Sequence, residues 1–353
     1  MNALSPIRPW HRVLFASLGL VSMAIIRRDL LAAGEISSWA EIAAWGLLTF
    51  GFWWSRDLDL RFNAMVGRLY QRRVISAETS EVGALLSTIA ARARTNARIG
   101  AVVFPLAIIF AYVCVYFSRE RTGDHFWLKI ALEIAAGALV GGIGGRVVTY
   151  GFLGQWLRQR NLPIQVKLGH PDGTGGLKVV GDFFLYQATL VLLPAIFFAF
   201  WWAIAPAWPV DVSVGPFDFL EWRNLFALFF LILIGIETLA FVAPMIFFHR
   251  KMFESRQLFD READEIGEAI LQIDEELAEP TDGESIEKLA IRRQQLESRF
   301  QQLDAAPIWP VDSRIRHRFT WGNTALFALP MLTKLPFMPR LIEDTLNNLL
   351  GIQ

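Results

Sequence analysis

The feature that most constrains this fold is a series of apolar segments, each about as long as a lipid bilayer is thick. A spanning helix needs roughly 20 mostly apolar residues. Four segments reach that length, and they are 99–118, 128–153, 184–208 and 224–248. Two shorter apolar segments, 13–26 and 39–54, precede them. The sequence therefore predicts an all-α fold, a polytopic membrane helix bundle with about six transmembrane helices.

The distribution of basic residues predicts which ends of these helices face the cytoplasm. Cytoplasmic loops of membrane proteins carry an excess of Lys and Arg. Here the basic segments are 55–98, with eight arginines, 154–183, and the chain from 249 onward. Six crossings place all three on one side, with both termini in the cytoplasm of a multi-pass bacterial inner-membrane protein. With five crossings, the N-terminal residues instead face out, or 13–26 is a re-entrant segment.

The region 249–306 differs from the apolar segments and predicts a cytoplasmic helical hairpin. Apolar residues recur in steps of three, four and seven, as in a coiled-coil seam. They are Ile266, Ile270, Ile273 and Leu277, then Leu289, Leu296 and Leu303. The turn 280–283 contains Pro and Gly and separates two helices. The helix over 224–248 is expected to continue without a break into the first of them.

The remaining residues, 307–353, are predicted to form a C-terminal cytoplasmic or interfacial segment. Pro307 and Pro310 end the hairpin, and 324–338 is apolar but interrupted by Pro330, Lys334 and Pro336. An interfacial or docking helix is expected there, with a seventh crossing as the alternative.

Three glycines spaced by four residues, Gly137, Gly141 and Gly145, form a flat face on the predicted fourth span. Small residues at this spacing allow another helix backbone to approach closely. Two interpretations stay open: tight packing within one subunit, or a pore-lining or subunit-contact helix.

Ionisable residues at membrane depth are candidate pore or ion-binding residues, because an isolated charge is costly in hydrocarbon. Glu237 lies near the middle of 224–248, while Glu133 and Arg146 lie in the fourth span. Glu237 can form an ion or proton site, pair with Arg146, or stay protonated and hydrogen-bonded.

A glycine-rich loop over 169–181 precedes the fifth span and contains candidate ligand-binding residues. They are His170, Asp172, Gly175, Gly176 and Lys178. Glycines permit positive φ and allow backbone N–H groups to converge on an anion. Asp172 and Asp182, the residue that follows this loop, can instead bind a cation, or the whole segment can be a compact turn that fixes the fifth helix.

The basic residues of 55–98 are all arginines, and several follow helical spacing. The candidates for ligand binding are Arg61, Arg68, Arg72, Arg94 and Arg98. They can set topology and contact anionic membrane lipids. Alternatively, they can bind a phosphorylated ligand or an oligonucleotide at the inner mouth.

Motifs for catalysis, metal binding or phosphate-loop chemistry are missing from the sequence. It lacks HExxH, CxxC and GxSxG, its five histidines are scattered, and its single cysteine is Cys114. We therefore expect a protein that is not an enzyme, with neither a metal site nor a cofactor.

The loop and the end of the hairpin resemble a group of bacterial multi-spanning membrane proteins. These share an HPD-x-x-GGL loop, here from His170 to Leu177, and a late coiled segment that ends near Pro-x-Trp-Pro, here Pro307 to Pro310. The resemblance covers about 165–320 and implies no activity. The layout is also similar to membrane effectors of anti-phage systems, including the channel partner of the Hailong nucleotidyltransferase.

These features favour an oligomeric ion channel, cation-conducting and regulated by a cytoplasmic nucleotide or oligonucleotide. A homotetramer is the expected assembly. One alternative is a proton- or sodium-coupled secondary transporter, although the sequence shows no inverted repeat. The other is a scaffold or signalling protein that recruits a partner through its hairpin.

Overall fold

The computed structural model describes residues 10–28, 36–115, 126–167, 169–204, 219–278 and 283–332, and these confirm the all-α fold. The helices are α1 (Trp10–Ile26), α3 (Ile36–Ser55), α4 (Leu58–Gln71), α5 (Thr79–Val115), α6 (Phe126–Gly151), α7 (Leu153–Gln159), α8 (Lys178–Ile204), α9 (Phe219–Ala278), α10 (Gly283–Asp304) and α11 (Ser313–Leu332). Within the described residues, β-structure is limited to one antiparallel bridge between Ile75 and Ile164.

Four helices are long and apolar enough to cross a membrane, which indicates a membrane protein. The qualifying stretches are Thr79–Phe110, Trp127–Gly151, Lys178–Phe200 and Ala227–Ala278. Helix α1 is apolar but has only 17 residues. Crossings by α1 and α3, which would complete the six, stay a prediction.

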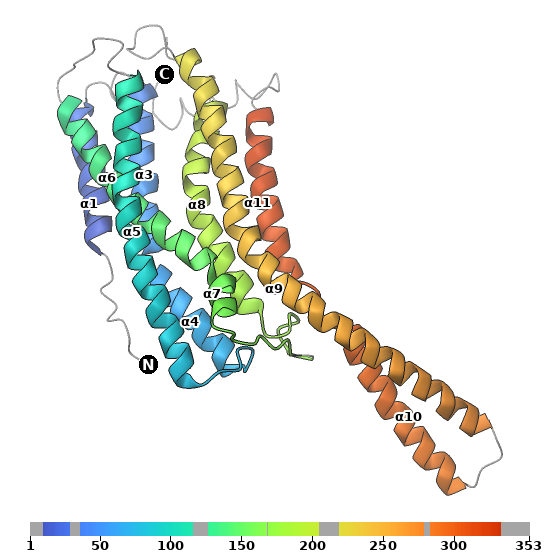
Figure 1. The fold of residues 1–353 in the computed structure, drawn as a ribbon. Coiled ribbons are helices and arrows are strands. Elements are labelled where there is room, and N and C mark those ends of the chain that lie inside the picture. Colours follow the sequence, from blue (N-terminus) through green and yellow to red (C-terminus); the bar gives the residue numbers. More distant parts are fainter. Residues whose placement is uncertain are drawn as a thin grey trace.

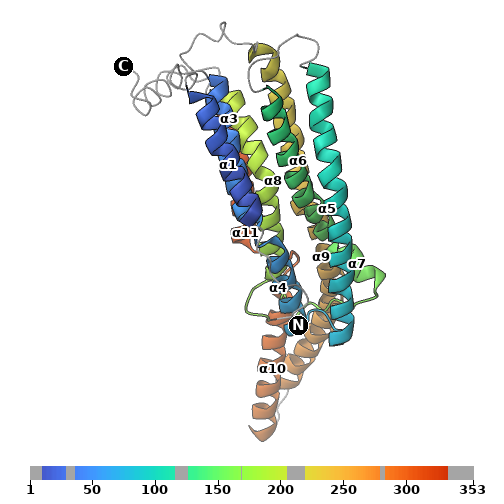
Figure 2. The ribbon, with the colours of Figure 1, turned by 90° about the vertical axis from the view of Figure 1, so that its left-hand side faces the viewer.

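In the view of Figure 1, helices α1, α3, α5 and α6 stand on the left and α8, α9 and α11 on the right, with α4 and α7 at the lower end. In the turned view of Figure 2, α8 lies beside α3, and the two helices are in contact. The largest apolar core lies at that lower end, where Phe62 and Leu69 of α4 pack with Leu153 of α7 and Phe184 of α8. This core also includes Leu177, the last residue of the glycine-rich loop before α8, and Met252, where α9 leaves the bundle.

Helix α9 is a single helix of 60 residues, so the predicted continuation from the apolar span into the hairpin is confirmed. Pro244 lies inside it without ending it. Its distal half projects from the bundle beside α10 (Figure 1). Cross-helix ion pairs hold the hairpin, among them Arg293 to Asp274 at 2.5 Å, Arg299 to Glu262 at 2.7 Å and Arg256 to Asp304 at 3.4 Å.

Helix α11 begins at Ser313, earlier than the predicted 324–338, and lies along α8. It also meets α9 through side-chain contacts. Its register against α9 is antiparallel, since Phe319 stacks on Phe241 with ring centroids 4.4 Å apart and Phe327 meets Phe230 at 5.6 Å. The helix thus docks against the part of α9 that is apolar enough to span a membrane. The predicted residues beyond 332 lie outside the described part.

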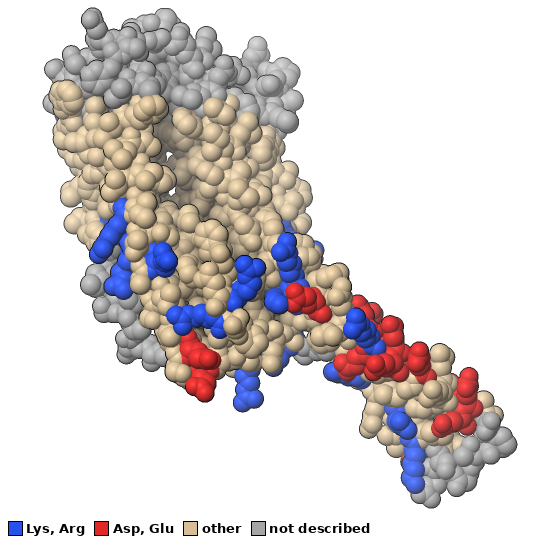
Figure 3. All heavy atoms as spheres, viewed as in Figure 1, with Lys and Arg blue, Asp and Glu red and all other residues tan. Residues whose placement is uncertain are grey.

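Charged side chains gather at the lower end of the bundle and along the hairpin in the view of Figure 3. The described surface above them in this view is formed by uncharged residues. This distribution matches an apolar zone for the membrane and a charged zone on the side where the hairpin projects.

Candidate functional site

The glycine-rich loop is organised around the carboxylate of Asp172. Its Oδ1 accepts hydrogen bonds from the backbone N–H groups of Thr174 and Gly176, both at 3.0 Å. Its Oδ2 accepts one from Arg72 at 2.9 Å and a longer one from the Lys178 N–H at 3.4 Å. The backbone donors that the sequence offered to an external anion are therefore bound to the chain's own carboxylate.

Backbone geometry explains why this loop is rich in glycine. Gly169, Gly173, Gly175 and Gly176 all have positive φ, between 65° and 90°. At Gly176 a Cβ would also collide with Val74 of the α4–α5 connection. These observations support the compact-turn interpretation of the loop.

The loop is also fastened to the connection between α4 and α5. Arg72 donates to the Gly176 carbonyl at 3.1 Å as well as to Asp172, and the Gln165 N–H donates to the Val74 carbonyl at 2.8 Å. The α4 end, the α4–α5 connection and the loop thus form one hydrogen-bonded unit.

The segment between α10 and α11 connects this unit to the hairpin. Asp312 caps α11 by accepting from the Ile315 N–H at 2.8 Å, and it pairs with Lys178 at 2.8 Å. Gly181 of α8 lies so close to Val311 and the Pro310 carbonyl that a Cβ would force them apart. The two motifs that carry the sequence resemblance therefore lie next to each other. We call residues 303–315 the junction.

The junction contacts α8 through Lys178 and Gly181, and it also contacts α9. Arg256 donates to three carbonyls at the end of α10, those of Leu303, Asp304 and Ala306, at 2.6–3.2 Å. His249 stacks on Trp309 with ring centroids 4.0 Å apart. The junction thus joins the loop to the long helix that enters the apolar bundle.

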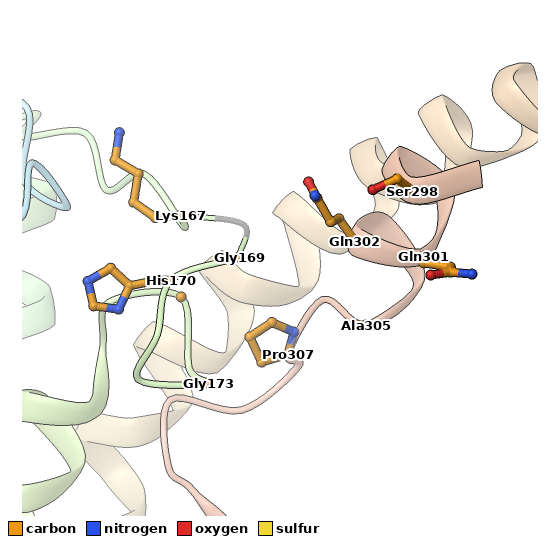
Figure 4. Close-up of a pocket in the computed structure, with 10 residues that line it drawn as sticks. Lys167, Gly169, His170, Gly173, Ser298, Gln301, Gln302, Ala305 and Pro307 are labelled. Atoms are coloured by element: carbon orange, nitrogen blue, oxygen red, sulfur yellow. The ribbon is translucent and has the colours of Figure 1, made fainter. Parts of the chain in front are cut away.

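A cavity of about 310 Å³ lies between the loop and the end of α10. The loop contributes Lys167, Gly169, His170, Gly173 and Gly175, while α10 and the junction contribute Ser298, Gln301, Gln302, Ala305 and Pro307. Figure 4 shows the loop and α10 on opposite sides of it. Its volume is at the small end of the range typical of small-molecule sites.

Two carboxyl groups of this region have lowered pKa values. For Asp172, burial alone would raise the pKa, but the hydrogen bonds from Gly176 and Thr174 and the nearby His170 outweigh it. For Asp312, the main cause is the hydrogen bond from Lys178. Both groups stabilise the folded loop and junction in their charged forms.

No protein-family model, curated protein or solved structure matches this chain.

Glu237 lies inside the bundle and is 2% exposed. Its Oε2 accepts a hydrogen bond from Asn323 of α11 at 3.2 Å, and the Thr238 side chain also bonds to it. The Asn323 Oδ1 is buried and has no hydrogen-bond partner among the described residues. The structure thus covers the predicted ion site with α11.

The alternative pairing of Glu237 with Arg146 is wrong. Arg146 donates to Asp59 at the start of α4, and the Tyr150 hydroxyl donates to the same carboxylate at 2.6 Å. Asp59 follows the turn that ends α3, which brings it to the lower end of α6. Arg146 therefore pairs with Asp59, which lies beside it in the folded chain although the two are 87 residues apart in sequence.

Glu133 lies at the opposite end of α6, in a second charged cluster. Lys129 lies between Glu133, at 4.0 Å, and Glu41 of α3, which also pairs with Arg27 of α1 at 3.3 Å. The predicted site residues Glu133, Arg146 and Glu237 thus have different neighbours and do not form one site.

The glycine face of α6 packs against α5 within the chain. A Cβ on Gly141 would collide with the Gly100 carbonyl, and one on Gly145 would collide with the Asn96 carbonyl. Gly137 meets Ile108 in the same way. The interpretation as tight packing within one subunit is confirmed for this face.

The candidate arginines are divided among several neighbours. Arg61 stacks on the Tyr186 ring at 4.3 Å, Arg68 lies in electrostatic range of Asp182, and Arg72 binds the loop. Arg94 and Arg98 are exposed on α5. A ligand-binding role for any of them stays a prediction.

Proposed function

We propose that the protein is an ion channel of the bacterial inner membrane, controlled from the cytoplasm through its hairpin. The observation that carries this proposal is the continuity of α9, which holds Glu237 in its apolar half and forms the hairpin with its distal half. Because the helix is unbroken, it provides a continuous connection by which a displacement of the hairpin moves the backbone around Glu237 in the proposed mechanism.

Helix α11 is the gate in this proposal. It covers Glu237 through Asn323, and its first turn is anchored at the junction by Asp312. A lone carboxylate is strongly unfavourable in hydrocarbon. Once water reaches it, the carboxylate carries a negative charge that attracts cations, as acidic side chains do in cation channels. Movement of α11 away from α9 would therefore expose a cation-selective site.

Ligand control is assigned to the cavity between the loop and α10. A molecule that binds there contacts both the glycine-rich loop and the end of α10. It shifts the equilibrium between two positions of the hairpin if its affinities for the two differ. We take the ligand class, a nucleotide or oligonucleotide, from the resemblance to anti-phage membrane effectors, and we propose a homo-oligomer, a tetramer on the same analogy.

Flux from liposomes tests the channel and its gate. Asn323→Ala removes the cover of Glu237 and should raise the basal cation flux. Thr324→Ala, at the next and exposed position of α11, is the matched control and should behave as wild type. A wild-type protein without flux, together with an Asn323→Ala variant that is equally silent, would reject the channel.

A scaffold is the second candidate, because the hairpin has exposed apolar side chains. Leu258, Leu271 and Ile291 are 63%, 65% and 52% exposed. Absence of flux combined with capture of a cytoplasmic partner through these residues would favour this function. Uptake coupled to a proton or sodium gradient would instead indicate a transporter.

A further inference from the structure

Another cluster of charged residues, different from the one around Glu133, lies at the lower end of α1. It contains Arg12 of α1, Asp59 of α4, and Arg146 and Tyr150 of α6. Arg12 lies in electrostatic range of both Arg146 and Asp59. Tyr150 and Arg146 donate to Asp59. One carboxylate thus faces two guanidinium groups.

Both guanidinium groups keep an unused donor. The Nε atoms of Arg12 and Arg146 are buried and have no hydrogen-bond partner among the described residues. Arg146 uses Nη1 for Asp59, so its Nε edge is left for another acceptor. Buried donors are normally paired, and two such donors on neighbouring arginines indicate a missing acceptor.

The charge balance around this cluster is positive. Arg56 lies over the Trp10 and Trp53 rings at 5.2 and 4.9 Å, and Arg61 lies over Tyr186. With Arg12 and Arg146 these make four arginines, against Asp57 and Asp59. The excess of two positive charges favours an anion.

The position of the cluster places it at one face of the predicted membrane zone. Lys129, in the opposite charged cluster, is 17 residues from Arg146 along α6, which is about 26 Å at the rise of an α-helix. The hydrocarbon core of a bilayer is roughly 30 Å thick. The two clusters are therefore separated by a little less than the thickness of the hydrocarbon core, which places Arg12 near the edge of the predicted apolar zone. Long basic side chains reach the lipid headgroups from such positions.

We propose that Arg12 and Arg146 form a binding site for a phosphate group, which completes their hydrogen bonding through the Nε edges. A guanidinium edge presents two parallel N–H donors that match two phosphate oxygens. The Arg146 side chain is 25% exposed while both Nε atoms are buried, so an incoming phosphate reaches the Nε edges by displacing the side chains that cover them. The phosphate can belong to an anionic phospholipid of the inner leaflet or to a free phosphate compound.

The full-length protein in detergent, stripped of lipid, provides the test. Binding of short-chain phosphatidylglycerol and of inorganic phosphate is measured by native mass spectrometry and thermal shift, with phosphatidylcholine and chloride at matched ionic strength for comparison. Arg12→Gln should weaken binding about tenfold or more, as expected for loss of a charge-assisted bond. Arg28→Gln, an equal charge change at an exposed position two residues beyond the other end of α1, should not.

A variant with the opposite expected effect separates binding from folding. Asp59→Asn removes the carboxylate that competes for the arginines, and it should tighten phosphate binding. If Arg12→Gln does not fold, Arg12→Lys keeps the charge but lacks the two-donor edge, and it should also weaken binding.

The outcomes identify the source or reject the site. Arg12-dependent binding of phosphatidylglycerol alone assigns a lipid headgroup, and Arg12-dependent binding of inorganic phosphate assigns a free anion. Equal binding by wild type and the Arg12 variants, or weaker binding by Asp59→Asn, overturns the proposal.

Discussion

Replacement of Asp172 by Asn tests whether the loop is held by its own carboxylate. Asn keeps one oxygen, which can still accept from Thr174 and Gly176, but it places an NH₂ group where Oδ2 accepts from Arg72 at 2.9 Å. The Asp172 side chain is only 7% exposed, so water cannot replace the lost partner fully. A charge-assisted hydrogen bond contributes about 1.5–3 kcal/mol, and with the facing donors left unpaired we expect a local cost of about 2–3 kcal/mol.

That cost corresponds to an increase of about 30- to 150-fold in the population of the opened loop. Limited proteolysis with trypsin at Lys167 measures this population, because cleavage follows local opening when reclosing is fast. Asp264→Asn, at an exposed position of α9, should leave the cleavage rate unchanged. A cleavage rate in Asp172→Asn within about threefold of wild type would show that the carboxylate network does not hold the loop.

Three further changes test other parts of the structure. Gly141→Ala should destabilise the α5–α6 contact by about 1–3 kcal/mol, whereas Gly142→Ala, with only a carbonyl at 3.7 Å, should be tolerated; thermal unfolding in detergent compares them, and equal melting temperatures would contradict the packing. Arg256→Gln removes the donors to three carbonyls at the end of α10 and should increase hydrogen exchange there by the equivalent of about 1–2 kcal/mol. The exposed control Arg261→Gln should leave this exchange unchanged. Equal exchange in both variants would contradict the role of Arg256. The pKa of Asp172 is lowered in the folded loop, so its stabilisation is present above the ordinary carboxyl value of 3.8 and is lost as pH falls through the folded pKa. Hydrogen exchange in the loop, corrected for intrinsic rates, should show protection near neutral pH and loss of protection below the folded pKa. Protection that survives below the folded pKa would contradict the role of the Asp172 carboxylate.

The sequence predicted the helices from apolar length and heptad spacing, which are local properties. The continuity of α9 was predicted because Gly and Pro are missing between Pro244 and Gly267, and the structure agrees. The start of α5 at Thr79, 20 residues before its apolar part, was missed because those residues are polar enough to read as a loop.

The partners of the charged residues could not be predicted, because they are far apart in sequence. Asp59 and Arg146 are separated by 87 residues and Glu237 and Asn323 by 86. Glu237 was singled out correctly as a buried group, since a carboxylate in an apolar run is readable from sequence alone. Asn323 lies in a helix with a polar first half, and nothing in its surroundings in sequence indicates a buried contact.

The reversal potential of single-protein currents in a planar bilayer tests the central claim most directly. With a KCl gradient across the membrane, the wild-type current should reverse close to the potassium equilibrium potential, because the proposed channel selects cations through the Glu237 carboxylate. Glu237→Gln keeps the side-chain shape and can still accept from Asn323, so the protein should fold but its reversal potential should shift toward zero. Glu254→Gln, on the same helix but in the exposed hairpin, should match wild type. A protein without current, or a reversal potential identical in wild type and Glu237→Gln, would contradict the proposed channel.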